Sequence, residues 1–318
     1  MATSASEHPG ARNPGNVALW LREARLPFMT ASVIPVALGA VVALFETGLF
    51  SLPLFLLTLA GAVLAHAGAN MANDYYDTMS GNDDINRYRS PFNGGAGLIQ
   101  DGLLTSRQVH AAALTAFAVA AGIGVYLAYV RGPAVLVLAL VGGLFAYFYT
   151  ANPLHLAYYG LGELMVGASF GPLLVVGAYL VQTGTASPVV VLASVPVGFL
   201  IAAVLYINQF PDYEADKAVG KRHWVVRLGT RRALPGLSGL LAATYLSVVA
   251  AVALGLAPWP TLSALLTIPM SAKALRIAWT HHASPVELRP ANALVIGTHL
   301  VTGLLLSAGF LATALVLG

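Results

Sequence analysis

Residues 188–216 read PVVVLASVPVGFLIAAVLYINQFPDYEAD, and this stretch decides the class of fold. Its first part, Pro188–Asn208, carries no charged side chain. About 20 consecutive apolar residues are enough to cross a bilayer as a helix. Acidic residues follow directly at Asp212, Glu214 and Asp216. The stretch therefore predicts a membrane-spanning helix that ends in a polar, acidic segment.

Similar apolar stretches recur along the whole chain of 318 residues, of which 58% are hydrophobic and 9% charged. Soluble domains carry about 25% charged residues, so we expect an all-α membrane protein. We count nine spans: Pro27–Thr47, Phe50–Asn73, His110–Val130, Pro133–Thr150, Leu161–Val181, Pro188–Asn208, Ala233–Ala257, Trp259–Trp279 and Asn292–Leu317.

The charged residues predict the orientation of these spans. With the N-terminus inside, every Lys and Arg except Arg131 falls on the cytoplasmic side, and so does every Asp and Glu except Glu46. Because basic residues favour the cytoplasmic face, we expect an integral, multi-pass protein of the cell membrane, with its polar chemistry facing the cytoplasm. Residues 1–16 are polar and contain Pro and Gly, which predicts a disordered N-terminal tail before a single domain over residues 17–318.

Composition also excludes several classes of function. The chain has no cysteine, which excludes disulfides, thiol nucleophiles and cysteine-ligated metals. A net charge of +3 is too small for a nucleic-acid-binding surface. The expected partners are the lipid bilayer and small molecules, and the sequence gives no indication of protein partners.

The first acidic cluster is Asn70-Met71-Ala72-Asn73-Asp74-Tyr75-Tyr76-Asp77, followed by Asp83 and Asp84. On a helix, Asp74 and Asp77 share one face. Two carboxylates this close repel each other at a membrane boundary unless a cation lies between them. Oxygen ligands without histidine or cysteine favour Mg²⁺.

The second cluster is Asn208-Gln209-Phe210-Pro211-Asp212-Tyr213-Glu214-Ala215-Asp216. Asp212 and Asp216 are four residues apart and again share a helical face. Lys221 and Arg222 follow Gly220, an order that suits a metal-bound polyphosphate. A single Asp pair is usually a solvated face or a helix cap, but two pairs at the same side of the membrane favour a functional site. We expect the two motifs to face each other across a cytoplasmic cavity and to hold a diphosphate through Mg²⁺.

A diphosphate at the mouth of an apolar bundle implies a lipid tail, and an isoprenoid diphosphate fits this description. Mg²⁺ and cationic side chains would neutralise the diphosphate as the allylic C–O bond breaks. The resulting carbocation needs aromatic faces and the absence of water. Candidates for these faces, which can also be read as a belt at the membrane interface, are Tyr147, Phe148, Tyr149, Tyr158 and Tyr159.

These residues resemble the UbiA superfamily of intramembrane prenyltransferases. Asn73, Asp74 and Asp77 match its first motif, while Gly81 replaces a further acid and Asp83 follows. That displacement resembles the 1,4-dihydroxy-2-naphthoate polyprenyltransferases, as do GGAGLIQDGLLT from Gly94, YTANPLHLAYYGLGE from Tyr149 and GAYLVQTG from Gly177. DYEADKAVGKRHWVVRLG from Asp212 matches the second motif, although the preceding NQF lacks the basic residue expected in naphthoate enzymes.

The resemblance implies nine helices around a central cavity open to the cytoplasm and to lipid, and it assigns roles to single residues. Asn73, Asp74 and Asp77 would hold one Mg²⁺ with support from Asp83, and Asp212 and Asp216 would hold a second. Glu163 would orient or deprotonate the acceptor, although an acid there also suits a helix N-terminus. The remaining candidate substrate contacts are Arg25, Arg87, Arg89, Tyr149, Asn208, Lys221 and Arg222.

The expected function is Mg²⁺-dependent transfer of a polyprenyl group to 1,4-dihydroxy-2-naphthoate with loss of CO₂, in menaquinone biosynthesis. Alternative acceptors are 4-hydroxybenzoate, a related naphthoate and a glycerol-phosphate lipid. A secondary transporter is a different alternative, but transporters place their charges near the bilayer midplane. The signature of CDP-alcohol phosphotransferases is absent.

Two features leave a structural and a functional interpretation open. His66 and His299 lie within spans, where histidines are commonly packing residues, yet His66 lies seven residues before Asn73 on nearly the same helical face and would line a cavity. His155 and His223 lie beside the motifs. The glycine-rich loop 90–97 could close over the site as a lid.

Overall fold

The computed structural model describes residues 16–317, so the predicted tail lies almost entirely outside the described residues. From Asn16 to Leu317 the protein is built of helices, and this part of the chain contains no β-strand. Seven helical segments are long and apolar enough to cross a membrane. The prediction of an all-α membrane protein is therefore confirmed.

Each of the nine predicted spans coincides with a helical segment. Two of them fall below the length of a single spanning α-helix: α6 has 16 residues, and α13 has 14 residues preceded by a 3-10 helix. In chain order the segments are η1–α2 (Leu26–Met29, Thr30–Thr47), α3 (Leu52–Met79), α5 (Ser106–Arg131), α6 (Pro133–Phe148), α7–η3–α8 (Gly162–Ala168, Ser169–Leu173, Leu174–Thr183), α9 (Pro188–Asn208), α12 (Thr230–Ala253), η4–α13 (Trp259–Thr267, Ile268–His281) and α14 (Pro285–Leu317).

Proline accompanies the irregular turns inside the bundle. Pro172 lies within η3, a π-helical turn between α7 and α8, and it cannot donate the hydrogen bond that a regular α-helix needs. Pro260 lies in the first turn of η4, whose 3-10 geometry continues to Thr267. The π-helical turn η3 widens the local backbone and the 3-10 segment η4 tightens it, but in both cases the helical segment continues.

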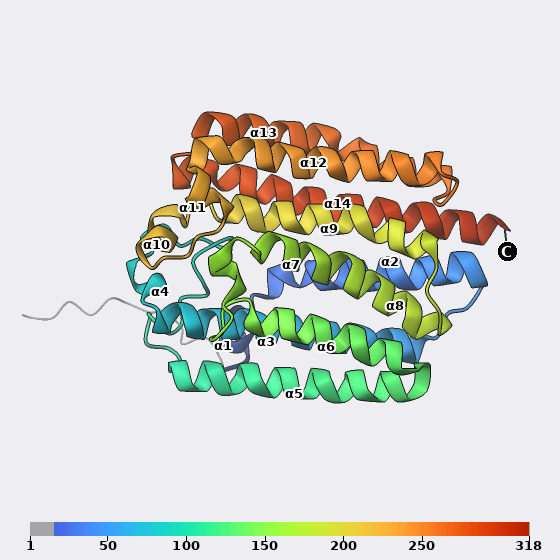
Figure 1. Cartoon of the computed structure of the whole chain (residues 1–318), viewed down its shortest axis with the longest axis horizontal. Coiled ribbons are helices and arrows are strands. Elements are labelled where there is room, and N and C mark those ends of the chain that lie inside the picture. Colours follow the sequence, from blue (N-terminus) through green and yellow to red (C-terminus); the bar gives the residue numbers. More distant parts are fainter. Residues whose placement is uncertain (1–15, 318) are drawn as a thin grey trace, which may run out of the picture.

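The long helices run side by side, with α12 and α13 at one edge of the bundle and α5 at the other (Figure 1). Small residues allow close packing between them. A Cβ atom on Gly171 of η3 would lie 2.7 Å from the Cα atom of Gly198 on α9. A Cβ atom on Gly39 of α2 would lie 2.3 Å from the carbonyl oxygen of Val175 on α8. Neither glycine can be enlarged without moving a helix.

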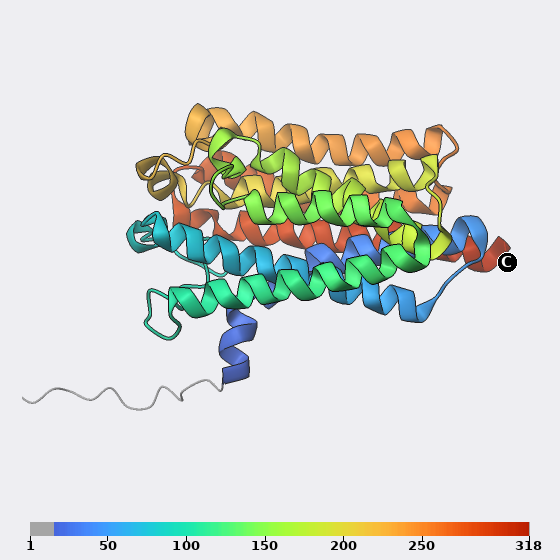
Figure 2. The same ribbon diagram turned by 60° about the horizontal axis from the view of Figure 1, so that its bottom comes forward.

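The short helices gather at one end of the bundle, where the long polar loops meet (Figure 1). They are η2 (Leu156–Tyr159), α4 (Asn82–Ile85), α10 (Tyr213–Ala218) and α11 (Trp224–Leu228). The dark blue helix α1, Asn16–Glu23, projects sideways from the bundle near the same end (Figure 2). This arrangement brings the two acidic motifs to one place.

Candidate active site

The first acidic motif lies on the last turns of α3, which continues to Met79 and past the predicted end of the span. Asp74 and Asp77 are buried, with exposed fractions of 3% and 6%. The Asn73 Nδ2 donates a hydrogen bond to Asp77 Oδ2 at 3.0 Å. Gly81 (φ 75°) then turns the chain into α4, where Asp83 is also buried. All four candidate ligands of the first motif are thus brought together at the end of α3.

The second motif begins where α9 ends. Asp212 is the residue immediately before α10, and Asp216 lies buried within that helix. Asn208 is the last residue of α9, and its Oδ1 accepts a hydrogen bond from Asn292 of α14 at 2.8 Å. This bond fixes the end of α9 immediately before the motif.

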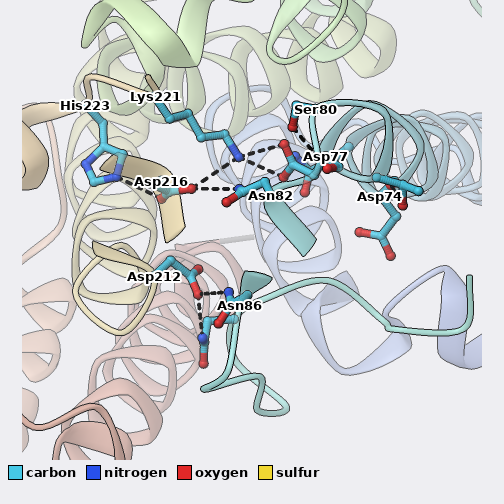
Figure 3. Close-up of polar contacts among 12 residues, drawn as sticks. Asp74, Asp77, Ser80, Asn82, Asn86, Asp212, Asp216, Lys221 and His223 are labelled. Carbon is cyan, nitrogen blue, oxygen red and sulfur yellow. Dashed lines mark hydrogen bonds and ion pairs between the residues drawn. The ribbon is translucent and has the colours of Figure 1, made fainter. Parts of the chain in front are cut away.

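Lys221 joins the two motifs. Its Nζ donates to both carboxylate oxygens of Asp77, at 2.8 and 2.7 Å, and lies 3.6 Å from Asp216 Oδ1 (Figure 3). Burial alone would lower the pKa of Lys221, but the two carboxylates outweigh burial and raise it well above its ordinary value. The ammonium group is therefore charged and placed between the motifs.

Two further side chains fix Asp216. Asn82 of α4 donates to Asp216 Oδ1 at 2.8 Å, and His223 Nε2 lies 2.9 Å from Oδ2. Because His223 Nδ1 accepts the Val226 N–H, Nε2 carries the proton and donates to the carboxylate. Burial opposes ionisation of Asp216, but Lys221 and His223 outweigh it, so the pKa of Asp216 is lowered.

The glycine-rich loop 90–97 lies across both motifs. The Asn93 Nδ2 donates to Asp212 Oδ1 at 2.6 Å, as does the Asn86 Nδ2 just before the loop. The Ala96 N–H donates to Asp74 Oδ2 at 2.8 Å. The loop is therefore positioned to cover the site, and its opening as a lid stays a prediction.

Arg25, a predicted diphosphate contact, lies beside the first acidic motif. Its guanidinium group forms an ion pair with Asp74 and donates to Asn73 Oδ1 at 3.2 Å. Its backbone adopts the left-handed conformation (φ 55°), which costs a non-glycine residue about 1–2 kcal/mol. The Asn70 Nδ2 donates to the carbonyl oxygen of the preceding Ala24 at 3.0 Å and so holds this turn in place.

The other predicted cationic contacts lie farther out. Arg89 donates to the Gly97 carbonyl oxygen at 3.4 Å and lies 3.6 Å from Asp101, so it packs against the loop. Arg87 and Arg222 are exposed, and their side chains form no hydrogen bond with any residue in 16–317. Among the predicted cations, Arg25 and Lys221 contact the carboxylates directly.

Glu163 lies in the first turn of α7 and is buried. Neither of its carboxylate oxygens has a hydrogen-bond partner among the described residues. Tyr149 packs against the preceding residue, since a Cβ atom on Gly162 would lie 3.0 Å from the Tyr149 ring. Burial raises the pKa of Tyr149, with Glu163 adding to the effect and Lys221 opposing it. An unpaired carboxylate and a neutral phenol therefore flank the acidic motifs.

A buried carboxylate that the sequence did not single out lies beside Arg25. Glu23 ends α1, its exposed fraction is 0%, and its oxygens have no partner within residues 16–317. Burial and the charge of Asp74 raise the pKa of Glu23 to about 8, although Arg25 opposes the shift. At neutral pH Glu23 therefore keeps its proton and adds no negative charge beside Arg25.

The donor set fits Mg²⁺. A Cβ atom on Gly95 would lie 2.8 Å from Asp83 Oδ2 and 3.2 Å from Asp74 Oδ1, so the missing side chain leaves room between two carboxylates. Burial, together with Asp77 and Asp74, raises the pKa of Asp83 to about 8. Within residues 16–317, no three His, Cys, Asp or Glu side chains approach closely enough to hold a metal as they stand. Arg25 pairs with Asp74, and Lys221 pairs with Asp77.

The residues missed by sequence reasoning are Asn82, Asn86 and Asn93, which contact the second motif, and Glu23. For His223, the sequence predicted a position beside the second motif but no role. The signal for the asparagines was their concentration in the loop that follows the first motif.

Comparison with known proteins gives consistent matches. The family model described as "UbiA prenyltransferase family" matches residues 32–294. A 2-carboxy-1,4-naphthoquinone phytyltransferase of Synechocystis is 30% identical over 97% of this chain and 98% of its own length. A 1,4-dihydroxy-2-naphthoate octaprenyltransferase of Bacillus subtilis is also 30% identical, over 89% of both chains.

Solved structures show the same fold. The apo structure of a UbiA homologue from Aeropyrum pernix has a TM-score of 0.63 and 20% identity, covering 89% of this chain and 97% of that one. A UbiA homologue from Archaeoglobus fulgidus bound to GPP and Mg²⁺ has a TM-score of 0.60 and 18% identity, covering 91% of this chain and 99% of that one.

Proposed function

Because this chain belongs to the UbiA prenyltransferase family, we propose that it transfers a polyprenyl group from an isoprenyl diphosphate to 1,4-dihydroxy-2-naphthoate. The reaction is Mg²⁺-dependent, releases the acceptor carboxylate as CO₂ and serves menaquinone biosynthesis. The observation that carries the proposal is the pair of buried acidic motifs joined by Lys221 at one end of an apolar bundle. The names of the Synechocystis and Bacillus relatives support the choice of a naphthoate acceptor.

In this proposal the acidic motifs hold the metal and two cations hold the diphosphate. When bound, Mg²⁺ supplies the positive charge that neutralises the leaving diphosphate. Arg25 and Lys221 donate charge-assisted hydrogen bonds to phosphate oxygens, since both already lie against the carboxylates. The proposed metal ligands are Asn73, Asp74, Asp77 and Asp83 for one ion and Asp212 and Asp216 for the other.

Glu163 is the proposed base for the acceptor. Its two oxygens are buried without partners, so the carboxylate is free to accept the proton of an acceptor hydroxyl. Deprotonation makes the ring more electron-rich before it attacks the prenyl C1 atom. Tyr149 lies next to Glu163 and offers an aromatic face to the developing cation.

We also propose that all nine helical segments cross the membrane around a central cavity open to the cytoplasm and to lipid. The charges support a cytoplasmic N-terminus and a cytoplasmic site, because all Lys and Arg except Arg131 fall on that side. Residues 17–318 form one domain in this scheme, embedded in the cell membrane.

Single substitutions in each motif test the proposal. We expect Asp74→Ala and Asp212→Ala each to abolish the prenylation of naphthoate by a labelled prenyl diphosphate in reconstituted membranes, while the proteins stay folded. Asp84→Ala is the matched control, because Asp84 is an exposed acid of the same loop. Unchanged turnover in either motif variant would refute the site.

A panel of acceptors tests the substrate. We expect turnover with 1,4-dihydroxy-2-naphthoate and little with 4-hydroxybenzoate or a glycerol-phosphate lipid. Preference for another acceptor would retain the prenyltransferase and change its substrate. Uptake into liposomes without any prenylated product would instead indicate a transporter.

A further inference from the structure

His66 lies at the middle of α3, fourteen residues after Leu52 and thirteen before Met79. It precedes Asp77 by eleven residues, which on an α-helix brings the two side chains to within about 20° of the same face. The rise per residue places His66 about 16 Å deeper in the membrane than Asp77. An ionisable ring at that depth is expensive and by default marks a functional position.

The ring of His66 is held by two neighbouring helices. Its Nδ1 lies 3.0 Å from the Ser32 Oγ on α2, and its edge packs against Phe170 of η3 with ring centroids 4.9 Å apart at 65°. In either tautomer Nδ1 is satisfied by Ser32, and Nε2 forms no hydrogen bond with any residue in 16–317. The ring is only partly buried, so it borders space that protein atoms do not fill.

This free nitrogen lies on the side of the active site. On α3, His66 shares a face with Asp77, whose carboxylate lies in the site beside Lys221. Phe170, which packs against the ring, lies in η3, and η3 continues directly from α7, the helix that carries Glu163. His66 therefore opposes the helix that carries the unpaired carboxylate.

The chemistry of the two substrates decides what His66 contacts. A prenyl chain is hydrocarbon and offers no hydrogen bond to an imidazole nitrogen. A hydroxylated aromatic ring does, and a hydroxyl group pairs with either tautomer because it both donates and accepts. We propose that His66 is a positioning residue for the aromatic acceptor, binding one of its hydroxyl groups through Nε2. This inference rests on the proposed function and adds a specificity contact to it.

The test compares His66→Leu, His66→Gln and wild type as full-length protein in lipid nanodiscs. We expect His66→Leu to raise the KM for 1,4-dihydroxy-2-naphthoate about three- to tenfold, the size of one neutral hydrogen bond, with the KM for prenyl diphosphate unchanged. His66→Gln keeps a polar group at this position and should recover most of the affinity. His110→Leu is the control, because His110 stacks on Tyr75, which projects from another face of α3.

Direct binding gives a second readout that a packing role would not move. Wild type should bind 1,4-dihydroxy-2-naphthoate more tightly than 2-naphthoate, and His66→Leu should lose this discrimination. Ser32→Ala removes the hydrogen-bond partner of the His66 ring and should lose part of this discrimination. It is the alternative test if His66→Leu does not fold. An unchanged acceptor KM, or an equal rise in both KM values, would overturn the proposal.

Failure of the inference and failure of the proposed function are distinguishable. If wild type prenylates no naphthoate, the proposed acceptor is wrong, while the comparison of the two naphthoates still tests His66. If His66→Leu raises the KM for prenyl diphosphate alone, His66 lines the path of the prenyl chain, and the acceptor contact is refuted.

Discussion

Replacing Lys221 with methionine tests whether its charge stands where the metal and the diphosphate act. Lys221 is buried, and its ammonium group contacts Asp77 at 2.7 Å and Asp216 at 3.6 Å. Methionine keeps much of the volume and removes the charge. Two buried carboxylates from different motifs are then left facing each other without a cation.

These two distances set the size of the electrostatic attraction that Lys221→Met removes. With an effective dielectric constant of about 20, the attraction is about 6 kcal/mol to Asp77 and about 5 kcal/mol to Asp216. Desolvation of the ammonium group offsets much of this gain, and removing one partner of a buried pair typically costs about 3–5 kcal/mol. In the absence of metal we therefore expect Lys221→Met to lower the free energy of unfolding by about 3–5 kcal/mol. Mg²⁺ at a hundredfold excess over its Kd returns about 2.7 kcal/mol, so Lys221→Met should depend on Mg²⁺ for its stability.

The assay follows thermal unfolding in detergent as Mg²⁺ is added. We expect Mg²⁺ to raise the Tm of Lys221→Met by more than it raises the Tm of wild type, where the lysine already neutralises the carboxylates. Lys217→Met is the matched control, since Lys217 is exposed and lies over the Tyr213 ring, 5.4 Å from its centroid. Equal Mg²⁺ shifts in Lys221→Met and wild type would refute the reasoning.

Three further predictions concern the surroundings of the carboxylates. Gly95→Ala should raise the Mg²⁺ concentration needed for half-maximal turnover about tenfold, because the added Cβ would fill the gap between two acids. Gly102→Ala is the control: it has similar backbone strain (φ 69°), but nothing lies within 4 Å of the added Cβ, so the Mg²⁺ requirement should not change. Asn70→Ala should release the turn that holds Arg25 and weaken binding of a non-hydrolysable prenyl diphosphate analogue about tenfold; unchanged binding would contradict this. Glu23 keeps its proton in the folded protein up to about pH 8 but loses it near pH 4.5 when the protein is unfolded. The free energy of unfolding therefore falls as pH rises from about 4.5 to about 8. Glu23→Gln avoids this loss, so its Tm advantage over wild type should grow from about pH 5 to about pH 8.

The helical segments were predictable from hydropathy, because a segment that crosses lipid must be apolar. The residues at which the helices end were not predictable in this way. The apolar pattern of the second span stops at Asn73, whereas α3 continues to Met79. Its last turns carry Asp74 and Asp77 on one face, and these acids turn to the site rather than to lipid. The 3-10 geometry of η4 has no hydropathy signature either, because Trp259–Thr267 is as apolar as an α-helix would be.

The acids of the site were predictable from local spacing, while their partners were not. Asp74 and Asp77 share a face by helical geometry alone. The contact between Asn86 and Asp212 joins residues 126 positions apart, and no local pattern specifies it. The packing of Arg89 is also non-local in origin: its side chain lies over Gly97, where a Cβ atom would lie only 1.8 Å from its Nη1, and its predicted contact with the diphosphate stays a prediction.

The arrangement of charges explains why metal and diphosphate should bind together. The acidic side chains of the two motifs outnumber Arg25 and Lys221. Burial, with a further contribution from the charges of Asp77 and Asp74, raises the pKa of Asp83 to about 8. A diphosphate alone would add negative charge to a site that already has an excess. A metal alone would have to compete with two cations that contact Asp74 and Asp77 directly. In the proposed function the carboxylates would hold the metal, and Arg25 and Lys221 would be free to donate to the phosphate oxygens, so every buried charge would keep a partner. On this proposal, Arg25 and Lys221 pair with the carboxylates before substrate binds and would supply the diphosphate contacts afterwards.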